Sequence, residues 1–335
     1  MPVTIHDVAK HAGVAVGTVS RYLNGYTLRE KNREKVEDAI EELGFKENIM
    51  ARGLKRNRSM TVAVVAPDFS SFVAAMTPVI EQELEKQRYS LITCNYQGDK
   101  EKLRKKLVFL KERFVDGIVL FPSNLADASI DLVQSWIDAE TPVVLLDHLI
   151  PGIHTDAVTV DNSNASFRAV ERLILENHAN IAIIDGPEDS YVSQERLKGY
   201  CAAMETYNLP IRENWIQRGA FTRTGGYHAV KALRESSNRP SAVYVANYEM
   251  TIGAILALHE MHVRIPEELS FIGFDHFEAI DVVEPPLTVV EQPIERMGQL
   301  AAEFLLKRLR GDYEDFPVIT KLNTKITIRS SIQSL

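Results

Sequence analysis

Cysteine is scarce in this chain, and long hydrophobic runs are missing. Cys94 and Cys201 are the only cysteines in 335 residues, and no C-x-x-C pair occurs. Neither a disulfide framework nor a cysteine zinc site is indicated, so a reducing cytoplasm is the expected compartment. The first ten residues, MPVTIHDVAK, lack the apolar segment of a signal peptide. No apolar run approaches the roughly 18 residues that span a bilayer, so we expect a soluble protein that binds no membrane.

Signatures of catalysis and of metal binding are also missing. The sequence contains no G-x-S-x-G, no P-loop and no G-x-G-x-x-G. His259 and His262 lack the H-E-x-x-H spacing that places two metal ligands on one helical face, and the nine histidines form no other cluster. We therefore expect no enzyme activity, no cofactor and no metal.

Charge is distributed unevenly along a chain that is long enough for two or three domains. Residues 1–58 carry eleven Lys or Arg against eight Asp or Glu, whereas residues 59–335 carry 27 against 38, which gives the total of −8. The segment KENIMARGLKRNR (46–58) holds five basic residues and one acidic residue. This basic excess could attract phosphates, although a solvated linker would have the same composition.

The N-terminal residues carry three short amphipathic helical patterns. Thr4 and Asp7 have the spacing of a capping box at the start of the first helix, and Gly13 supplies a turn before the second. The third helix is expected from about Arg29 to Leu43, where Gly44 ends it. Three helices in fewer than fifty residues predict a helix-turn-helix domain, against the alternative of a three-helix bundle without this function.

The second helix, in GVAVGTVSRYLNG, has an outer face suited to DNA. In a helix-turn-helix domain this helix enters the major groove with its N-terminal side chains at the base edges. Arg21 is the one long donor on the face and can contact guanine through two hydrogen bonds, whereas Thr18 and Ser20 suit phosphate oxygens. Val16 offers apolar contact, and Gly17 offers no side chain.

The segment TIHDVAKHAGVAVGTVSRYLNG closely resembles the headpiece of the lactose- and purine-repressor family, the LacI-type regulators, and REKVEDAIEELGF and NIMARGLKRNRS continue the resemblance. The resemblance implies that residues 47–56 form a hinge helix that folds on DNA and, paired with its dimer mate, inserts Leu54 into the minor groove. The predicted DNA-binding residues are Thr4, Val16, Gly17, Thr18, Ser20, Arg21, Asn24, Arg33, Ala51, Arg52, Leu54 and Lys55.

Two departures from the family pattern affect the headpiece. Ala15 stands where a serine usually caps the recognition helix, so a cap worth about 1 kcal/mol is missing. Leu28 and Arg29 replace a common Val-Ser pair in a segment one residue shorter than usual, which removes an expected phosphate contact.

After Ser59 apolar strands alternate with amphipathic helices, which is typical of parallel sheets covered on both faces. The alternation occurs twice, and PDFSSF, DGIVLFPS, VTVDN, QERLKGY and GFDHFEAIDVVEPPLTVVEQP resemble the family's effector domain, which is similar to periplasmic sugar-binding proteins. The predicted fold is therefore an all-α helix-turn-helix headpiece plus hinge helix, joined to an α/β periplasmic-binding-protein-like core of two doubly wound parallel-sheet subdomains. The predicted boundaries are 1–46 for the DNA-binding domain, 47–58 for the hinge, and 59–335 for the effector-binding and dimerisation domain, with an N-subdomain of about 59–160 and 291–321 and a C-subdomain of about 161–290 and 322–335.

Such sheets bind ligands beyond the C-terminal ends of their strands, so a cleft between the subdomains is expected. The strand ends carry Pro67, Pro122, Asp147, Asp185, Asn247 and Asp275. The resemblance implies that the effector-binding residues are Phe72 or Val73, Asp147, Arg196, Phe221, Asn247 and Asp275. Carboxylates, an arginine fork and an aromatic ring suit a sugar-like ligand. Arg196 could instead form a surface ion pair, Asp275 could cap a helix, and Phe221 could belong to the core.

These features predict a DNA-binding transcriptional regulator, a repressor of a carbohydrate-utilisation operon. The expected partners are double-stranded operator DNA, a small effector (sugar, polyol, sugar acid or related molecule) and a second copy of the chain. The segment KITIRSSIQSL lacks the apolar heptads that would join two dimers, so a homodimer is expected. Two alternatives are a global catabolite regulator controlled by a phosphorylated carrier protein, and an enzyme on the same scaffold.

Overall fold

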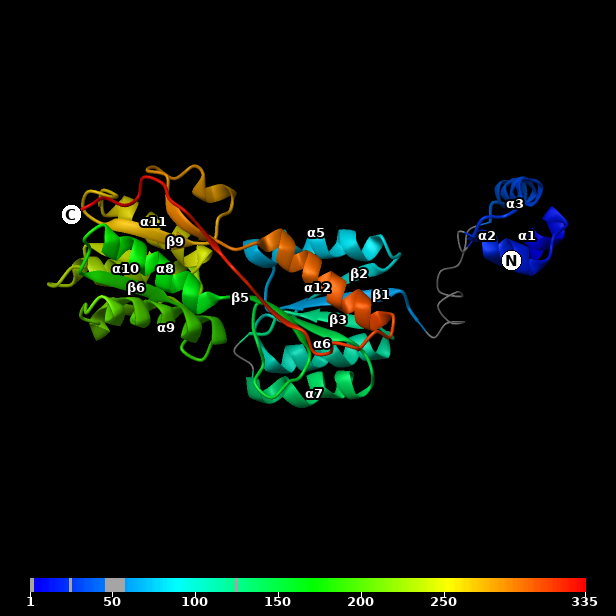
Figure 1. The fold of residues 1–335 in the computed structure, drawn as a ribbon, viewed down its shortest axis with the longest axis horizontal. Coiled ribbons are helices and arrows are strands. Elements are labelled where there is room, and N and C mark those ends of the chain that lie inside the picture. The colour runs from blue at the N-terminus through cyan, green and yellow to red at the C-terminus, as the bar shows by residue number, and fades with distance from the viewer. Residues whose placement is uncertain (1–2, 24–25, 46–57, 124–125) are drawn as a thin grey trace. The chain divides into compact units, whose positions relative to one another are not determined.

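The computed structural model describes residues 3–23, 26–45, 58–123 and 126–335 (Figure 1). The chain divides into two compact units, Met1–Met60 and Thr61–Leu335, and each is described by itself. Within the described ranges, no helix is long and apolar enough to cross a membrane.

The first unit contains three helices, which are α1 (Ile5–Ala12), α2 (Val16–Leu23) and α3 (Glu30–Leu43). The Thr4 side chain accepts a hydrogen bond from the Asp7 N–H, and the Asp7 carboxylate accepts one from the Thr4 N–H, so the predicted capping box is present. Gly13 and Gly44 end α1 and α3 in the left-handed conformation, with φ of 63° and 58°. The helices share a small core of Val8, Ala9, Ala12, Val19, Val36 and Ala39.

The second unit holds two six-stranded sheets, each with its own helices. The first sheet defines the N-subdomain and is parallel throughout, in the order β11-β5-β4-β3-β1-β2. Helices α5 and α12 pack together on one side of it, and α6 and α7 lie on the other (Figure 1). Its elements are β1 (Thr61–Ala66), α5 (Ser71–Glu85), β2 (Ser90–Asn95), α6 (Lys100–Glu112), β3 (Gly117–Leu120), α7 (Ala126–Asp138), β4 (Val143–Leu146), β5 (Asp156–Val160), α12 (Ile294–Leu309) and β11 (Ile319–Leu322).

The second sheet defines the C-subdomain and has the order β12-β10-β9-β8-β6-β7. Helix α8 packs against α9, and α10 packs against α11. The elements are α8 (Asn162–Leu175), β6 (Ile181–Asp185), α9 (Tyr191–Thr206), β7 (Ile216–Arg218), α10 (Arg223–Glu235), β8 (Ala242–Val245), α11 (Tyr248–Glu260), β9 (Ser270–Phe274), β10 (Thr288–Glu291) and β12 (Lys325–Thr327), with short 3₁₀ turns at Glu213–Trp215 and Glu278–Ile280.

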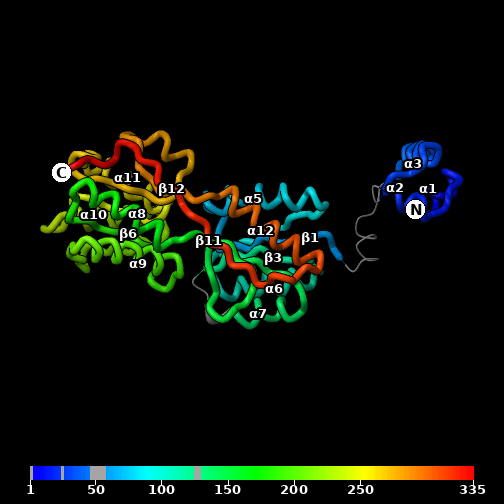
Figure 2. The backbone as a smooth tube through the Cα atoms, in the orientation of Figure 1, coloured from blue at the N-terminus to red at the C-terminus, as the bar shows by residue number. Residues whose placement is uncertain are grey.

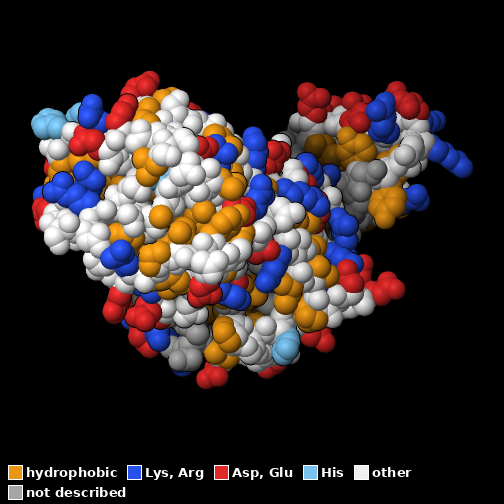
Figure 3. Space-filling model, turned by 60° about the vertical axis from the view of Figure 1, so that its left-hand side comes forward, with side chains coloured by type: hydrophobic (Ala, Val, Ile, Leu, Met, Phe, Trp, Pro, Cys, Tyr) orange, Lys and Arg blue, Asp and Glu red, His pale blue; other side chains and the backbone are white. Residues whose placement is uncertain are grey.

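Apolar side chains are concentrated inside the two subdomains. The strands β3, β4, β5, β6, β8 and β9 are buried along their full length, as expected for strands covered on both faces. On the face drawn in Figure 3, acidic and basic side chains are interspersed with small hydrophobic areas.

The two-sheet prediction is confirmed, with two corrections. Strand β12 runs antiparallel to β10, so the second sheet is not wholly parallel. Glu291 ends β10 in the C-subdomain and Leu322 ends β11 in the N-subdomain, so two predicted boundaries shift by one residue. The alternating pattern did not include β5, β7, β10, β11 and β12, which are three to five residues long.

The chain passes between the subdomains three times, in segments of one or two residues (Figure 2). Asp161 joins β5 to α8, residues 292–293 join β10 to α12, and residues 323–324 join β11 to β12. The Asp161 N–H donates to the Leu322 carbonyl at 2.9 Å, so the first crossing is hydrogen-bonded to the end of β11, directly before the third crossing. Short, linked crossings allow the subdomains to rotate while they limit other movements.

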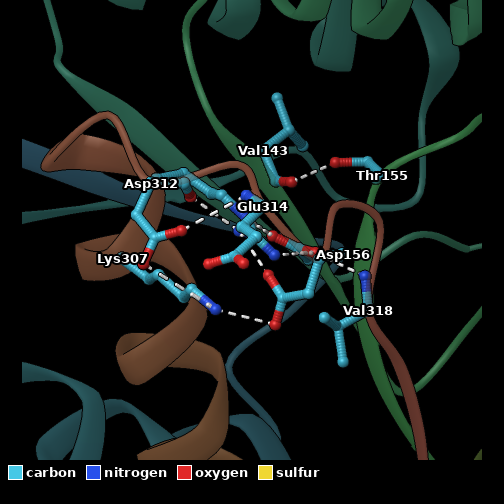
Figure 4. A network of polar contacts seen from close by, with 9 residues as sticks. Val143, Thr155, Asp156, Lys307, Asp312, Glu314 and Val318 are labelled. Atoms are coloured by element: carbon cyan, nitrogen blue, oxygen red, sulfur yellow. Dashed lines mark hydrogen bonds and ion pairs between the residues drawn. The ribbon is translucent and has the colours of Figure 1, made fainter.

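A buried ion pair fixes the strands that lead into two of these crossings (Figure 4). The Arg308 guanidinium donates from Nε to Asp156 Oδ2 at 2.7 Å and from Nη2 to Asp156 Oδ1 at 3.0 Å. Asp156 begins β5, and its Oδ1 also accepts from the Val318 N–H at 2.7 Å, directly before β11. Arg308 Nη1 bonds the Asp312 carbonyl and the Asp315 carboxylate, so the loop after α12 is held as well.

We predict that Arg308→Met lowers the free energy of unfolding by about 3–5 kcal/mol, because Asp156 is left as an unpaired buried charge. The measurement is urea unfolding of the full chain. Arg296→Met is the matched control on α12, since the Arg296–Glu303 pair is about half-exposed and should contribute less than about 1 kcal/mol. Equal losses for the two variants would contradict a structural role for the buried pair.

Candidate functional site

Helix α2 presents the predicted recognition residues on the side opposite its core contact. Gly17 and Arg21 are exposed, and Thr18 and Ser20 are half-exposed. Val19 points inward and is fully buried. Val16 is half-buried and packs against the headpiece core, so part of its apolar surface is used by the fold.

An exposed aromatic ring lies beside Arg21. The guanidinium is 5.8 Å from the centroid of the Tyr26 ring, and Tyr26 is 62% exposed. The Tyr26 N–H donates to the Arg21 carbonyl at 3.0 Å, which holds the two residues together. Tyr26 was not among the predicted residues, although an aromatic residue directly after a recognition helix is visible in the sequence.

Other predicted DNA-binding residues already have partners within the headpiece. The Thr4 hydroxyl donates to Asp7 Oδ2 at 2.6 Å as part of the capping box. Arg33 Nη2 lies 2.5 Å from Glu30 Oε1, and Arg33 Nη1 lies 3.9 Å from Glu37 Oε1. DNA contact by Arg33 would therefore compete with two carboxylates. The predictions for Asn24, Ala51, Arg52, Leu54 and Lys55 lie outside the described residues.

In the second unit, polar residues gather at the carboxyl ends of the two sheets. Asp147 follows β4 in the N-subdomain, whereas Asp185 ends β6 and Asp275 follows β9 in the C-subdomain. Asp147 and Asp275 both have left-handed backbone conformations, with φ of 74° and 71°. Asp is one of the non-glycine residue types that adopt this conformation most readily.

Arg196, from α9, is a central buried residue of this site. Its Nε donates to Asn162 Oδ1 at 2.8 Å, and its Nη1 donates to the Ala246 carbonyl. The guanidinium carbon lies 3.6 Å from the centroid of the Phe274 ring. Only 3% of Arg196 is exposed, so the alternative of a surface ion pair is wrong.

Asp275 is buried beside this guanidinium. Its Oδ1 accepts a hydrogen bond from Gln292 Nε2 at 2.7 Å, so a residue of the second crossing contacts the site directly. Burial raises the pKa of Asp275 to about 6, against the opposing effects of Arg196 and the Gln292 hydrogen bond. The charge of Asp147 raises this pKa further.

Asp185 is a site residue that the prediction noted at a strand end but did not select. Its side chain is fully buried, and Oδ2 lies 2.6 Å from Arg218 Nη1. Burial raises the pKa of Asp185 to about 6, while the Gly186 backbone and the Arg218 and Arg196 charges lower it. A buried, strongly perturbed carboxyl is typical of a functional site as well as of a structural ion pair.

The N-subdomain contributes Asp147 and His148 to the site. His148 Nδ1 lies 2.8 Å from Asp147 Oδ2. His148 Nε2 lies 3.3 Å from the hydroxyl of Ser190, which caps α9 in the C-subdomain. This contact joins the two subdomains at the site.

The remaining predicted effector-binding residues lie in α5, just before α10 and directly before α11. Val73 is buried in α5 and Phe72 in its first turn is half-exposed, and the choice between the two stays a prediction. Phe221 is half-buried and packs against the C-subdomain core. Asn247 Oδ1 accepts from the Met250 N–H at 3.1 Å and thus caps α11.

Five buried polar atoms of the site have no hydrogen-bond partner among the described residues. They are Asp147 Oδ1, His148 Nδ1, Asp185 Oδ1, Ser193 Oγ and Gln292 Oε1. Buried polar atoms are almost always satisfied, so each one indicates a partner beyond the protein itself. Across the described part of the chain, no group of three His, Cys, Asp or Glu side chains could hold a metal ion. Ordered water or a polar ligand would satisfy such atoms.

Together, a helix-turn-helix headpiece and a two-subdomain core with a polar site between its sheets define a ligand-responsive DNA-binding protein. The model for bacterial regulatory proteins of the lacI family matches residues 4–48, and the periplasmic binding protein-like domain matches residues 170–332. Catabolite control protein A of Priestia megaterium is 33% identical over 334 residues, with 99% of both chains covered. The repressor PurR of Aliivibrio fischeri (strain MJ11) is 33% identical over 333 residues, with 98% of both chains covered.

A solved transcriptional regulator, CelR in complex with cellobiose, is 29% identical, with a TM-score of 0.75 over 98% of this chain and 99% of that one. The chain belongs to the LacI family of bacterial transcriptional regulators. The predicted family and fold class are confirmed, and the relatives are DNA-binding regulators rather than enzymes.

We predict that Asp275→Asn stabilises the ligand-free protein by roughly 1–3 kcal/mol at about pH 7.5, because the folded state disfavours the ionised carboxyl. The folded pKa of about 6 lies above the ordinary value of 3.8, so the protonated group stabilises the fold at low pH, and this stability is lost as the pH rises through 6. The advantage of asparagine should therefore shrink towards about pH 5.

The measurement for Asp275→Asn is urea unfolding at both pH values. Asp281→Asn is the control, because the hydrogen bond from His276 lowers the pKa of this largely exposed carboxyl and the substitution should bring no gain. If Asp275→Asn destabilises the protein at both pH values, the folded state does not disfavour the ionised Asp275 carboxyl.

Proposed function

We propose that this chain is a cytoplasmic repressor of a carbohydrate-utilisation operon, which binds its operator as a homodimer and responds to a small sugar-like effector. Family membership shows a DNA-binding transcriptional regulator. The observation that carries the effector proposal is the set of five buried polar atoms of the site that have no hydrogen-bond partner among the described residues. The similarity to a regulator solved with cellobiose supports a sugar-like ligand.

The headpiece supports the DNA-binding part of the proposal through α2. Arg21 is exposed, lies on the face opposite buried Val19, and is the long hydrogen-bond donor of that face. A guanidinium can read guanine in the major groove through two parallel hydrogen bonds, which carry sequence information that phosphate contacts lack.

The control of DNA affinity follows from the linkage between the site and the crossings. An effector shifts an equilibrium only by its differential affinity for the two arrangements of the protein. Asp147 lies in the N-subdomain, Asp185 lies in the C-subdomain, and Gln292 lies in a crossing between them. A ligand that bonds all three would therefore favour one orientation of the subdomains over others, and through the dimer would alter the spacing of the two headpieces.

The alternative of a global regulator controlled by a phosphorylated carrier protein is supported by the similarity to catabolite control protein A. The two proposals differ in the partner that changes operator affinity. A small effector acts on the isolated protein, whereas a carrier protein must be added in its phosphorylated form.

The test starts with selection of binding sites from a random-sequence duplex pool by the full chain. Titration of the selected duplex, with and without compounds that raise the unfolding temperature, then measures the response. The proposed function predicts a two-fold symmetric site and an affinity that changes with a sugar-like compound. Response only to a phosphorylated carrier protein would support the alternative, and failure to select any site would overturn the proposal.

We predict that Arg21→Ala weakens binding to the selected site by about 1–3 kcal/mol and changes binding to random duplex much less. Fluorescence anisotropy with both duplexes measures the difference. Lys35→Ala, an exposed cation on α3, is the control and should affect both duplexes slightly and alike. If Arg21→Ala weakens binding to both duplexes equally, Arg21 contacts phosphates rather than bases.

A further inference from the structure

Arg21 has an aromatic neighbour in the headpiece rather than an acidic one. Its guanidinium carbon lies 5.8 Å from the centroid of the Tyr26 ring, which is within the range of a cation–π contact. Among the described residues of α1, α2 and α3, the ion pairs join His11 to Glu42 and Arg33 to Glu30 and Glu37. Arg21 takes part in none of these pairs.

Tyr26 does not share the structural role of Tyr22. Tyr22 packs against the headpiece core, and its hydroxyl donates to Glu37 Oε1 at 3.0 Å. Tyr26 is 62% exposed and does not pack against that core. Folding of the headpiece therefore does not account for an aromatic ring at this position.

The backbone holds the Tyr26 ring close to Arg21. The Tyr26 N–H donates to the Arg21 carbonyl at 3.0 Å, five residues earlier, so the chain turns back towards the end of α2. Arg21 lies in the last turn of this helix, on the face opposite fully buried Val19. A residue outside the recognition helix thus reaches the long donor of its outer face.

An aromatic ring can orient a guanidinium without using its hydrogen-bond donors. The five N–H donors lie in the plane of the guanidinium and point outward from its edge, whereas a stacked ring contacts its face. A carboxylate beside Arg21 would occupy donors that guanine needs, as Glu30 does for Arg33. A ring in this place leaves the edge of Arg21 free for two parallel hydrogen bonds to guanine.

The contact between Tyr26 and Arg21 should gain strength on DNA. Cation–π contacts are weak at exposed sites and stronger where water is excluded. Arg21 is exposed in the free protein, and it would lose water on entering the major groove. An arginine that is already oriented also loses less conformational freedom on binding. Both effects favour a base contact by Arg21 and do not act on phosphate contacts made elsewhere.

We infer that Tyr26 is a specificity-determining residue of DNA recognition, because its ring positions the Arg21 guanidinium for its contact with a base. This inference rests on the base contact of Arg21 proposed above, and it adds a residue outside α2 to those that select the operator sequence. Tyr26 is a positioning residue, since it acts through Arg21.

The experiment is a double-mutant cycle on the full chain, measured by fluorescence anisotropy with the selected duplex and with random duplex. Tyr26→Ala should weaken binding to the selected duplex by about fivefold and change binding to random duplex by less than about twofold. In the Arg21→Ala background, Tyr26→Ala should change binding to either duplex by less than about twofold, because the ring then has no cation to position.

Two further variants separate the ring from its hydroxyl and from its bulk. Tyr26→Phe keeps the ring, so it should bind the selected duplex within about twofold of the wild type. Tyr26→Leu keeps an apolar side chain without an aromatic face, so it should lose affinity as Tyr26→Ala does. The unfolding temperature should stay unchanged in all three variants, since the ring is outside the core. Tyr207→Ala, at a partly exposed tyrosine of the second unit, is the control and should leave both affinities unchanged.

Several results would overturn the inference. If Tyr26→Ala or Tyr26→Leu binds the selected duplex like the wild type, the ring does not position Arg21. If Tyr26→Ala weakens binding equally with and without Arg21, Tyr26 contacts DNA directly. If Tyr26→Phe loses as much affinity as Tyr26→Ala, the hydroxyl acts rather than the ring.

The Arg21→Ala variant distinguishes failure of this inference from failure of the proposed base contact. A loss confined to the selected duplex would keep the base contact of Arg21, whatever the Tyr26 variants do. Equal losses on both duplexes would remove that base contact and the inference with it.

Discussion

The ligand site depends on the interactions of the buried Arg196 guanidinium. It bonds Asn162 at the start of α8 and the Ala246 carbonyl after β8, and it stacks on Phe274 at the end of β9. Its charge also favours the ionised forms of the buried carboxyls at the ends of β6 and β9. Without this cation the two carboxyl groups would be forced towards the neutral form or out of the interior.

The same site is connected to the parts of the chain that permit movement. Gln292 bonds Asp275 at 2.7 Å and lies in the two-residue crossing between β10 and α12. The bond from Asp161 to Leu322 links the first crossing to the end of β11, directly before the third crossing, and the buried Asp156–Arg308 pair fixes the strands before these two crossings. Any rotation of one subdomain against the other would have to take place through these short, bonded crossings.

Local sequence signals predicted most of the fold. The headpiece helix ends could be predicted from the Thr4–Asp7 spacing and from Gly13 and Gly44. Helix caps and turns depend on residues that are close in the sequence. Buried strands such as IAIID and SFIGF were visible as continuous apolar runs. Strands β5, β7, β10, β11 and β12 were missed, and β7, β11 and β12 are short, partly polar strands that form through pairing with distant residues.

The site could be predicted only in part. Asp147 and Asp275 follow strands as expected and Arg196 is buried in α9, and their part in ligand binding stays a prediction. Ser193 and Gln292 were missed because a serine in a helix and a glutamine in a crossing carry no local signal. Their roles arise from burial without a protein partner, which depends on the tertiary arrangement. Arg218 was also missed, because its role depends on the ion pair that it forms from β7 with Asp185 of the neighbouring strand β6.

The most direct measurement is the affinity of the effector for the free protein and for the protein bound to its selected operator, by calorimetry under the same salt conditions. Linkage requires that the ratio of these two affinities equals the factor by which the effector changes the operator affinity. If the site controls DNA binding, the effector affinities for the free and the DNA-bound protein should differ by about fivefold or more. The effector should then change the operator affinity by the same factor. Equal effector affinity for the free and the DNA-bound protein would contradict it, because a ligand that binds both states equally shifts neither.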